Sequence, residues 1–149
     1  MLLRMNSLPK LLSLFLVVFA IAIPAHADEA AKTEAVAAME KWLTLVDEGK
    51  FAKSWEEASS DFKKAVSEKT WETSIASART PLGKLESRKL ASAMEQSQIP
   101  APDGSMLKGS FVIAQFDTSF KNLAYAIETV TFVKEGDAWR VSGYFVRPK

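Results

Sequence analysis

The chain has 149 residues, of which 48% are hydrophobic and 25% charged, and its formal net charge is +1. It contains no cysteine, and its single histidine is His26. The residues after His26 therefore cannot form disulfides, Ser-His-Asp or Cys-His nucleophiles, or the usual zinc and copper sites. Any chemistry there must use Asp, Glu, Lys, Arg, Tyr, Ser or Thr.

The N-terminus has the pattern of a secretory signal peptide. Arg4 and Lys10 precede an uncharged apolar run over residues 11–23, and small residues occupy Ala25 and Ala27. This pattern predicts a signal peptide over residues 1–27, cleaved after Ala27, and a periplasmic or secreted protein. A membrane anchor is the alternative, but the apolar run is shorter than the roughly 20 residues that span a bilayer.

Cleavage would leave residues 28–149, enough for a single exported domain with its own core. Arg4 and Lys10 would be lost, so 17 Lys and Arg would face 18 Asp and Glu, a formal charge of −1. Nucleic acids and anionic membranes attract proteins with a basic excess. We therefore expect neither nucleic acid nor, after cleavage, a membrane as partner.

The first half of this domain has helical patterns. They cover residues 28–49, 51–59, 61–66 and 68–79. Val36, Met39, Leu43 and Val46 form one apolar stripe at spacings of three and four, and Gly49 is suited to end that helix. Helix formation should stop before "PLG" at residues 81–83.

The second half has strand patterns. They cover residues 84–98, 109–116, 123–134 and 139–147, with a turn at residues 100–104. Alternation is poor in residues 84–98, where a helix is the alternative. Helices followed by about four antiparallel strands predict an α+β fold with the helices on one face of a bent sheet.

The last two strands can be aligned as a hairpin. A two-residue turn at Gly136–Asp137 pairs Phe132 with Val141 and Glu128 with Phe145. The core face would then carry Ala126, Glu128, Val130, Phe132, Trp139, Val141, Gly143, Phe145 and Arg147. The outer face would carry Tyr125, Ile127, Thr129, Thr131, Val133, Arg140, Ser142, Tyr144 and Val146.

Several segments carry a family resemblance. They are "KWLTLVDEGKFAKSWEEAS" (41–59), "RTPLG" (79–83), "ETVTFV" (128–133) and "WRVSGYFVR" (139–147). In this order they resemble the bacterial exported family called domain of unknown function 4019. The resemblance implies a nuclear transport factor 2-like cone, in which helices close one end of a strongly bent sheet over a pocket. Enzymes and non-catalytic binding domains share that fold, so it does not decide the function.

The pocket of such a cone would be lined by Trp55, Arg88, Gln115, Glu128 and Arg147. We expect a non-catalytic module that binds a small molecule or a protein, with no cofactor and no metal. The alternative is a cofactor-free acid/base enzyme of isomerase or hydrolase type, with Glu128 as base and Arg147 as helper. The simplest interpretation of Glu128 is a structural pair with Arg147 or Arg88, because an unpaired buried charge is costly.

Other residues have simpler interpretations. Arg79 is either a clamp for an anionic ligand or a cation that stabilises a helix C-terminus. Core packing at helical spacing explains Trp42, Trp55, Trp71 and Trp139, and the alternative is that they line a pocket for an apolar or aromatic ligand. The predicted outer face carries an apolar set: Tyr125, Ile127, Tyr144 and Val146. Such a face indicates a homodimer interface, or a protein that serves as a purely structural subunit of a complex through this face.

Overall fold

The computed structural model describes residues 25–101 and 103–149. The predicted signal peptide lies outside the described residues except for Ala25–Ala27, which begin the first helix. None of the described helices is long and apolar enough to cross a membrane. Export and cleavage therefore stay predictions.

The described chain consists of helices followed by strands. The helices are α1 (Ala25–Asp47), α2 (Phe51–Glu56), α3 (Ser60–Ala65) and α4 (Glu68–Arg79), and a 3-10 turn (Thr80–Leu82) follows. The strands are β1 (Leu85–Pro100), β2 (Met106–Phe120), β3 (Leu123–Glu135) and β4 (Ala138–Pro148). The α+β prediction is confirmed, and residues 84–98 belong to a strand. The closer likeness to the nuclear transport factor 2 cone stays a prediction.

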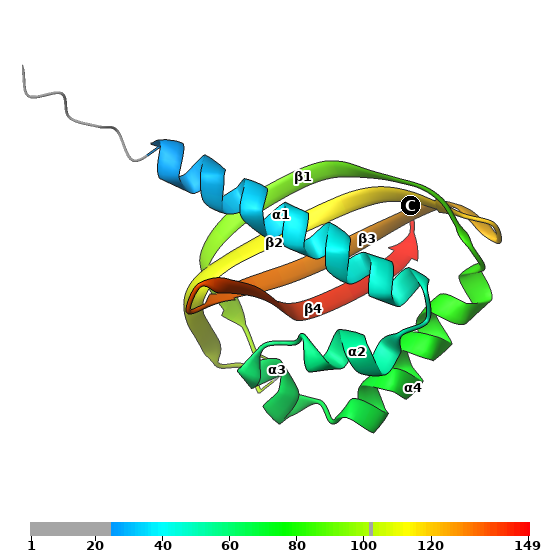
Figure 1. The fold of residues 1–149 in the computed structure, drawn as a ribbon, viewed down its shortest axis with the longest axis horizontal. Helices are drawn as coiled ribbons and strands as arrows, with labels where there is room; N and C mark the ends of the chain where they lie inside the picture. The colour runs from blue at the N-terminus through cyan, green and yellow to red at the C-terminus, as the bar shows by residue number, and fades with distance from the viewer. Residues whose placement is uncertain (1–24, 102) are drawn as a thin grey trace, which may run out of the picture.

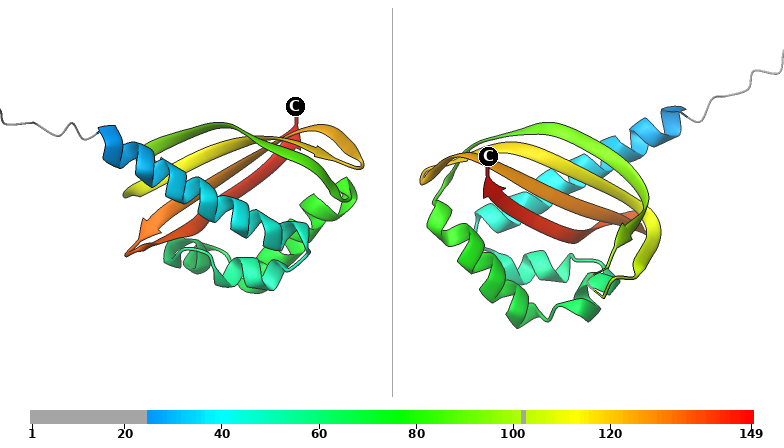
Figure 2. Two further views of the ribbon diagram at one scale, coloured as in Figure 1. Left: turned by 45° about the horizontal axis from the view of Figure 1, so that its top comes forward. Right: turned by 180° about the vertical axis from the view of Figure 1, so that it is seen from behind.

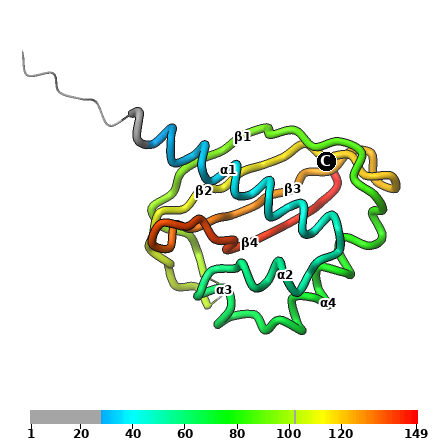
Figure 3. The backbone as a smooth tube through the Cα atoms, viewed as in Figure 1, coloured from blue at the N-terminus to red at the C-terminus, as the bar shows by residue number. Residues whose placement is uncertain are grey.

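The strands form one antiparallel sheet in the order β1-β2-β3-β4. The sheet is bent, α1 crosses its concave face obliquely, and α2, α3 and α4 lie beside β4 (Figures 1 and 3). The side and rear views show the helices on the concave side of the sheet (Figure 2). The convex face, called the outer face below, lies on the opposite side.

The core lies between α1, α4 and the concave face. Met39, Leu43 and Val46 of the predicted stripe are at most 2% exposed, whereas Val36 is only partly buried. They pack with Trp71 and Ile75 of α4 and with the sheet residues Val112, Phe116, Val130, Phe132 and Val141. The interior of the fold is therefore filled by side chains.

Three tryptophans are fixed in or against this core by hydrogen bonds. Trp42 Nε1 donates to the Ser54 carbonyl over 2.9 Å, and Trp71 Nε1 donates to Ser54 Oγ over 2.9 Å. Trp55 Nε1 donates to the Val66 carbonyl over 2.8 Å. Because a buried indole N–H needs an acceptor, the buried Ser54 holds Trp42 and Trp71 together.

Local sequence signals explain the helix boundaries. Ser59 and Ser67 cap α3 and α4, because their side chains accept hydrogen bonds from the amides of Phe62 and Thr70. Gly49, after α1, has a φ of 71°. This left-handed conformation is the one expected for a glycine that ends a helix.

The register of the β3–β4 hairpin differs from the prediction beyond its first pairs. The turn at Gly136–Asp137 and the pairing of Phe132 with Val141 are confirmed, but Thr131 pairs with Gly143. Ser142 is therefore an extra residue, a β-bulge, in β4. Because side chains alternate between the faces of a strand, the bulge moves every later β4 side chain to the opposite face.

Candidate functional site

Glu128 of β3 is the centre of a polar cluster inside the fold. Its side chain is completely buried, on the concave face between the buried residues Ala126 and Val130. The cluster, called the Glu128 network below, consists of Asp47, Arg79, Arg88, Thr118, Glu128 and Tyr144. Its members come from α1, α4 and all four strands.

Four hydrogen bonds saturate the Glu128 carboxylate. Arg88 Nε and Thr118 Oγ1 donate to Oε2 over 2.6 and 2.8 Å. Tyr144 Oη and Arg88 Nη2 donate to Oε1 over 2.6 and 3.2 Å. Each carboxylate oxygen thus has two donors, which offsets the cost of burying the group.

Arg88 joins this carboxylate to Asp47. Its Nη1 and Nη2 donate to the two Asp47 oxygens over 2.7 and 2.9 Å. Arg79 Nη2 donates to Asp47 Oδ1 over 2.6 Å. Two arginines therefore face two carboxylates, and the network has no net charge when all four are ionised.

The buried positions shift two pKa values. Burial opposes the charge on Arg88, but the hydrogen bonds and charges of Asp47 and Glu128 outweigh that effect, so the Arg88 pKa is raised. Burial also raises the pKa of Tyr144, and the charge of Glu128 raises it further. Arg88 thus remains a cation and Tyr144 a neutral donor at any physiological pH.

Arg79 is held mainly by contacts within the protein. Its side chain is 5% exposed, and its guanidinium lies 4.1 Å from the centre of the Phe120 ring. The Nε and Nη1 atoms are buried and have no hydrogen-bond partner among the described residues. Because these nitrogens are closed to solvent and the guanidinium lies over an aromatic ring, they are not available to bind an anion. The helix-terminal, structural interpretation of Arg79 fits this geometry.

The bulge at Ser142 reverses the predicted faces of Arg147 and Tyr144. Arg147 was expected on the concave face, but it pairs with Ile127 on the outer face, and its Nη1 donates to the Pro148 carbonyl over 3.1 Å. Tyr144 was expected on the outer face, but it pairs with Val130 and reaches Glu128. The predicted pair of Glu128 with Arg88 is present, whereas the pair with Arg147 is absent.

The other predicted pocket residues do not meet at Glu128. Gln115 is exposed on the outer face, between the inward-facing Ala114 and Phe116. Trp55 packs against the core, and its ring is covered by Lys63 Nζ at 5.4 Å. Of the five residues predicted to line a pocket, the structure brings together only Arg88 and Glu128.

Sequence reasoning missed Asp47, Thr118 and Tyr144 as members of the network. Asp47 ends α1, where the helix dipole disfavours an anion. That position was a signal that a cation must lie nearby. Gly143, inside a strand, was a signal of a bulge, which moves Tyr144 inward.

The geometry of the network fits a structural role. A general base needs a free lone pair within reach of a substrate, but Glu128 is fully buried and accepts four hydrogen bonds. Among the described residues, no group of three or more His, Cys, Asp and Glu side chains is placed to hold a metal ion. The geometry thus fits an internal ion pair that ties the helices to the sheet.

The comparison with protein families concerns most of the described chain. The family model described as "Protein of unknown function (DUF4019)" matches residues 38–144. The chain belongs to this family. The DUF4019 match begins in α1 and ends at Tyr144, so it includes every member of the Glu128 network. No curated protein and no solved structure matches the chain.

Proposed function

We propose that this DUF4019 protein is an exported, non-catalytic interaction domain that binds an acidic protein partner through the outer face of its sheet. The observation that carries the proposal is an apolar patch around Phe145, which is 77% exposed. The signal-peptide pattern supports export. The saturated Glu128 supports a non-catalytic role.

The patch, called the outer patch below, combines side chains from all four strands. Its members are Met94, Ile113, Tyr125, Ile127 and Phe145, of which Tyr125 and Met94 are 75% and 54% exposed. Isolated exposed apolar residues are common, but several on one uncovered sheet face are typical of an interaction surface. Aromatic residues in particular anchor protein interfaces.

A hollow at the edge of β4 adjoins Phe145. It has a volume of about 280 Å³ and is lined by Trp71, Ser74, Ile75, Ala78, Tyr144, Phe145 and Val146. Such a hollow beside an exposed aromatic ring offers a place for an apolar side chain of the partner. Hot-spot residues typically fill pockets of this kind.

The charges around the outer patch favour an acidic partner. Arg140 and Arg147 lie on the outer face and make no ion pair with any described residue. Asp117, a carboxylate on the same face, is already bonded to Lys149 over 2.8 Å. A second copy of this chain would bring arginines near arginines, whereas an acidic partner would neutralise them.

A photo-cross-linking amino acid placed at residue 145 in the native host tests the proposal. The control places the same group at Met106, which is 46% exposed in the β1–β2 hairpin. We expect adducts with an acidic protein from residue 145 only, and their loss when Arg140 and Arg147 are replaced by Gln. A cross-linked dimer of this chain, adducts with lipid, or equal adducts from both positions would overturn the proposal.

A further inference from the structure

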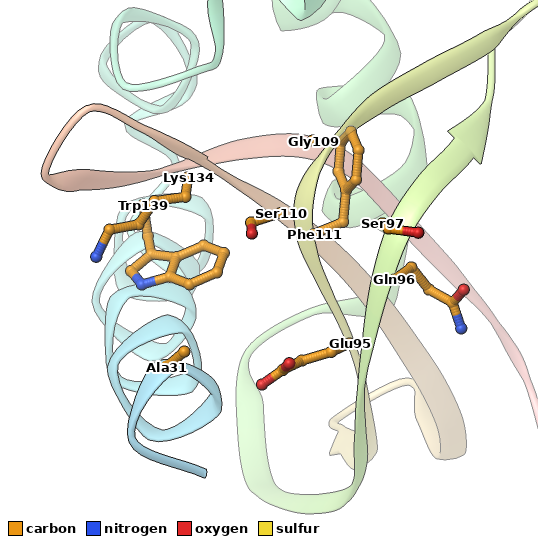
Figure 4. A pocket seen from close by; sticks show the side chains of 9 residues that line it. All are labelled: Ala31, Glu95, Gln96, Ser97, Gly109, Ser110, Phe111, Lys134 and Trp139. Atoms are coloured by element: carbon orange, nitrogen blue, oxygen red, sulfur yellow. The ribbon is translucent and has the colours of Figure 1, made fainter. Parts of the chain in front are cut away.

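A second hollow lies on the concave side of the fold, between α1 and one end of the sheet (Figure 4). Its volume is about 380 Å³, and it is lined by Ala31, Glu95, Gln96, Ser97, Gly109, Ser110, Phe111, Lys134 and Trp139. These residues include no member of the Glu128 network or the outer patch. The volume is near the lower limit of the roughly 300–1,000 Å³ that small-molecule sites occupy.

One aromatic side chain, Trp139, forms the apolar wall of this hollow and packs against the core. Phe111 pairs with Val133, whereas its neighbour Val112 pairs with the core residue Phe132, so the Phe111 side chain points to the other face of β2. The six-membered ring of Trp139 extends toward Ser110 (Figure 4). The faces of aromatic rings attract both apolar groups and cations.

The positive charge of Lys134 is already matched. Lys134 Nζ donates to the Glu34 carboxylate of α1 over 3.1 Å and lies 5.3 Å from the centre of the Trp139 ring. These contacts with Lys134 lower the pKa of Glu34, and Trp139 contributes to the effect. The Trp139 Nε1–H is buried and has no hydrogen-bond partner among the described residues.

Glu95 supplies the negative charge at the hollow. It is exposed, forms no ion pair with the described residues, and its carboxylate points toward the α1 side of the hollow (Figure 4). Lys32, the neighbouring cation of α1, is bonded to Glu29 over 2.7 Å. The hollow therefore combines one aromatic wall with one carboxylate that makes no ion pair with the described residues.

We infer that this hollow binds a small organic cation: an ammonium or guanidinium group on an apolar or aromatic body. The cation lies at Glu95, and the body lies against Trp139. A free amine and the Lys or Arg side chain of a peptide share this chemistry. The inference does not depend on the outer patch.

Indole N–H signals in nitrogen-15 NMR spectra test the inference on the full-length gene product, in the form its host yields. The chain has four tryptophans, and the Trp139 signal is assigned by its loss in Trp139→Phe. The probes are phenethylammonium, its anionic counterpart 3-phenylpropionate, and a lysine-containing tripeptide. We expect the cations to shift the Trp139 signal saturably and 3-phenylpropionate to have no such effect.

Variants of two glutamates on β1 provide a matched comparison. Glu95→Gln should weaken binding of the cation about two- to fivefold, the effect of one exposed ion pair. Glu86→Gln, on the same strand but outside the hollow, should leave it unchanged. If phenethylammonium binds more tightly than the tripeptide, the ligand is a free amine. If the tripeptide binds more tightly, the ligand is a Lys or Arg side chain of a peptide. No saturable shift up to about 10 mM, equal binding of the anion, or equal effects of both variants would overturn the inference.

Discussion

Tyr144 donates its hydroxyl hydrogen to Glu128 over 2.6 Å, from a strand in which simple alternation would place it on the opposite face. The contact exists because the bulge at Ser142 moves the later side chains of β4 to the opposite face of the strand. It is one of the four hydrogen bonds to a carboxylate that is completely buried. The stability of the fold should therefore depend on this hydroxyl.

Tyr144→Phe removes one donor from Glu128 and leaves the ring in place. We expect the free energy of unfolding to fall by about 1.5–3 kcal/mol, the usual contribution of a hydrogen bond to a charged group. Urea unfolding measures the change. Tyr125→Phe is the control, because Tyr125 is 75% exposed, and it should change stability by less than about 0.5 kcal/mol. Equal effects would contradict the assigned role of Tyr144.

The raised pKa of Tyr144 predicts a loss of stability in alkali. Folding holds the phenol neutral while the unfolded chain ionises near the ordinary value of 10.0, so the unfolded state then binds fewer protons. The stabilising contribution is complete below about pH 10 and should fall by up to about 1.4 kcal/mol per pH unit above it. Urea unfolding between about pH 9 and 11 should show this extra slope in the native protein and not in Tyr144→Phe. Identical slopes would refute the assignment.

Glu128→Gln should be strongly destabilising. The neutral amide leaves two arginines opposite Asp47 alone and turns an N–H₂ group toward donors, so we expect a loss of about 3–5 kcal/mol. Glu72→Gln, on the exposed side of α4, is the control and should be nearly neutral. Thermal and urea unfolding both report the difference. A Glu128→Gln protein of native stability would show that the network contributes little.

The stabilities of variants at Arg88 and Arg147 distinguish the observed strand register from the one that simple alternation predicts. Arg88→Gln should cost about 3–5 kcal/mol, because it leaves Glu128 and Asp47 without their shared cation. Arg147→Gln should change stability by less than about 0.5 kcal/mol, since Arg147 lies exposed on the outer face. If Arg147→Gln were more destabilising than Arg88→Gln, Glu128 would have to pair with Arg147 instead.

Deletion of Ser142 tests the bulge itself. Without the extra residue, Val141, Gly143 and Tyr144 would follow one another with their present partners, so regular alternation would keep Tyr144 on the concave face and Phe145 on the outer face. We therefore expect the deletion variant, like Ser142→Ala, to retain a cooperative transition. Circular dichroism during thermal unfolding compares the two variants. Loss of cooperative unfolding in the deletion variant would contradict the assignment of Ser142 as the extra residue.

The sequence contains most of the information for the fold and part of it for the network. Local signals located the helices, the strands and the turn at Gly136–Asp137, because caps, spacings and turn residues act over a few positions. Glu128 was placed inward correctly, since it lies on β3, whose alternation from Phe132 is uninterrupted, whereas the extra residue is in β4. Arg147 and Tyr144 were placed on the wrong faces, because one inserted residue reverses the alternation that follows it.

The distant partner Asp47 was harder to predict. Its contact with Arg88 joins residues 41 positions apart, and no periodic pattern relates the end of α1 to the start of β1. The unfavourable position of an acid at a helix C-terminus indicates only that some cation is needed. Which arginine supplies it depends on how the helices dock on the sheet.

The bond from Asp47 to Arg88 and on to Glu128 has a consequence for the environments in which the fold can persist. It connects the end of the first helix to two strands, as a disulfide might do in an exported protein, but the chain has no cysteine. Reductants and oxidants act on sulfur and leave carboxylates and guanidinium groups unchanged. This internal connection between helix and sheet should therefore hold equally well in reducing and oxidising surroundings.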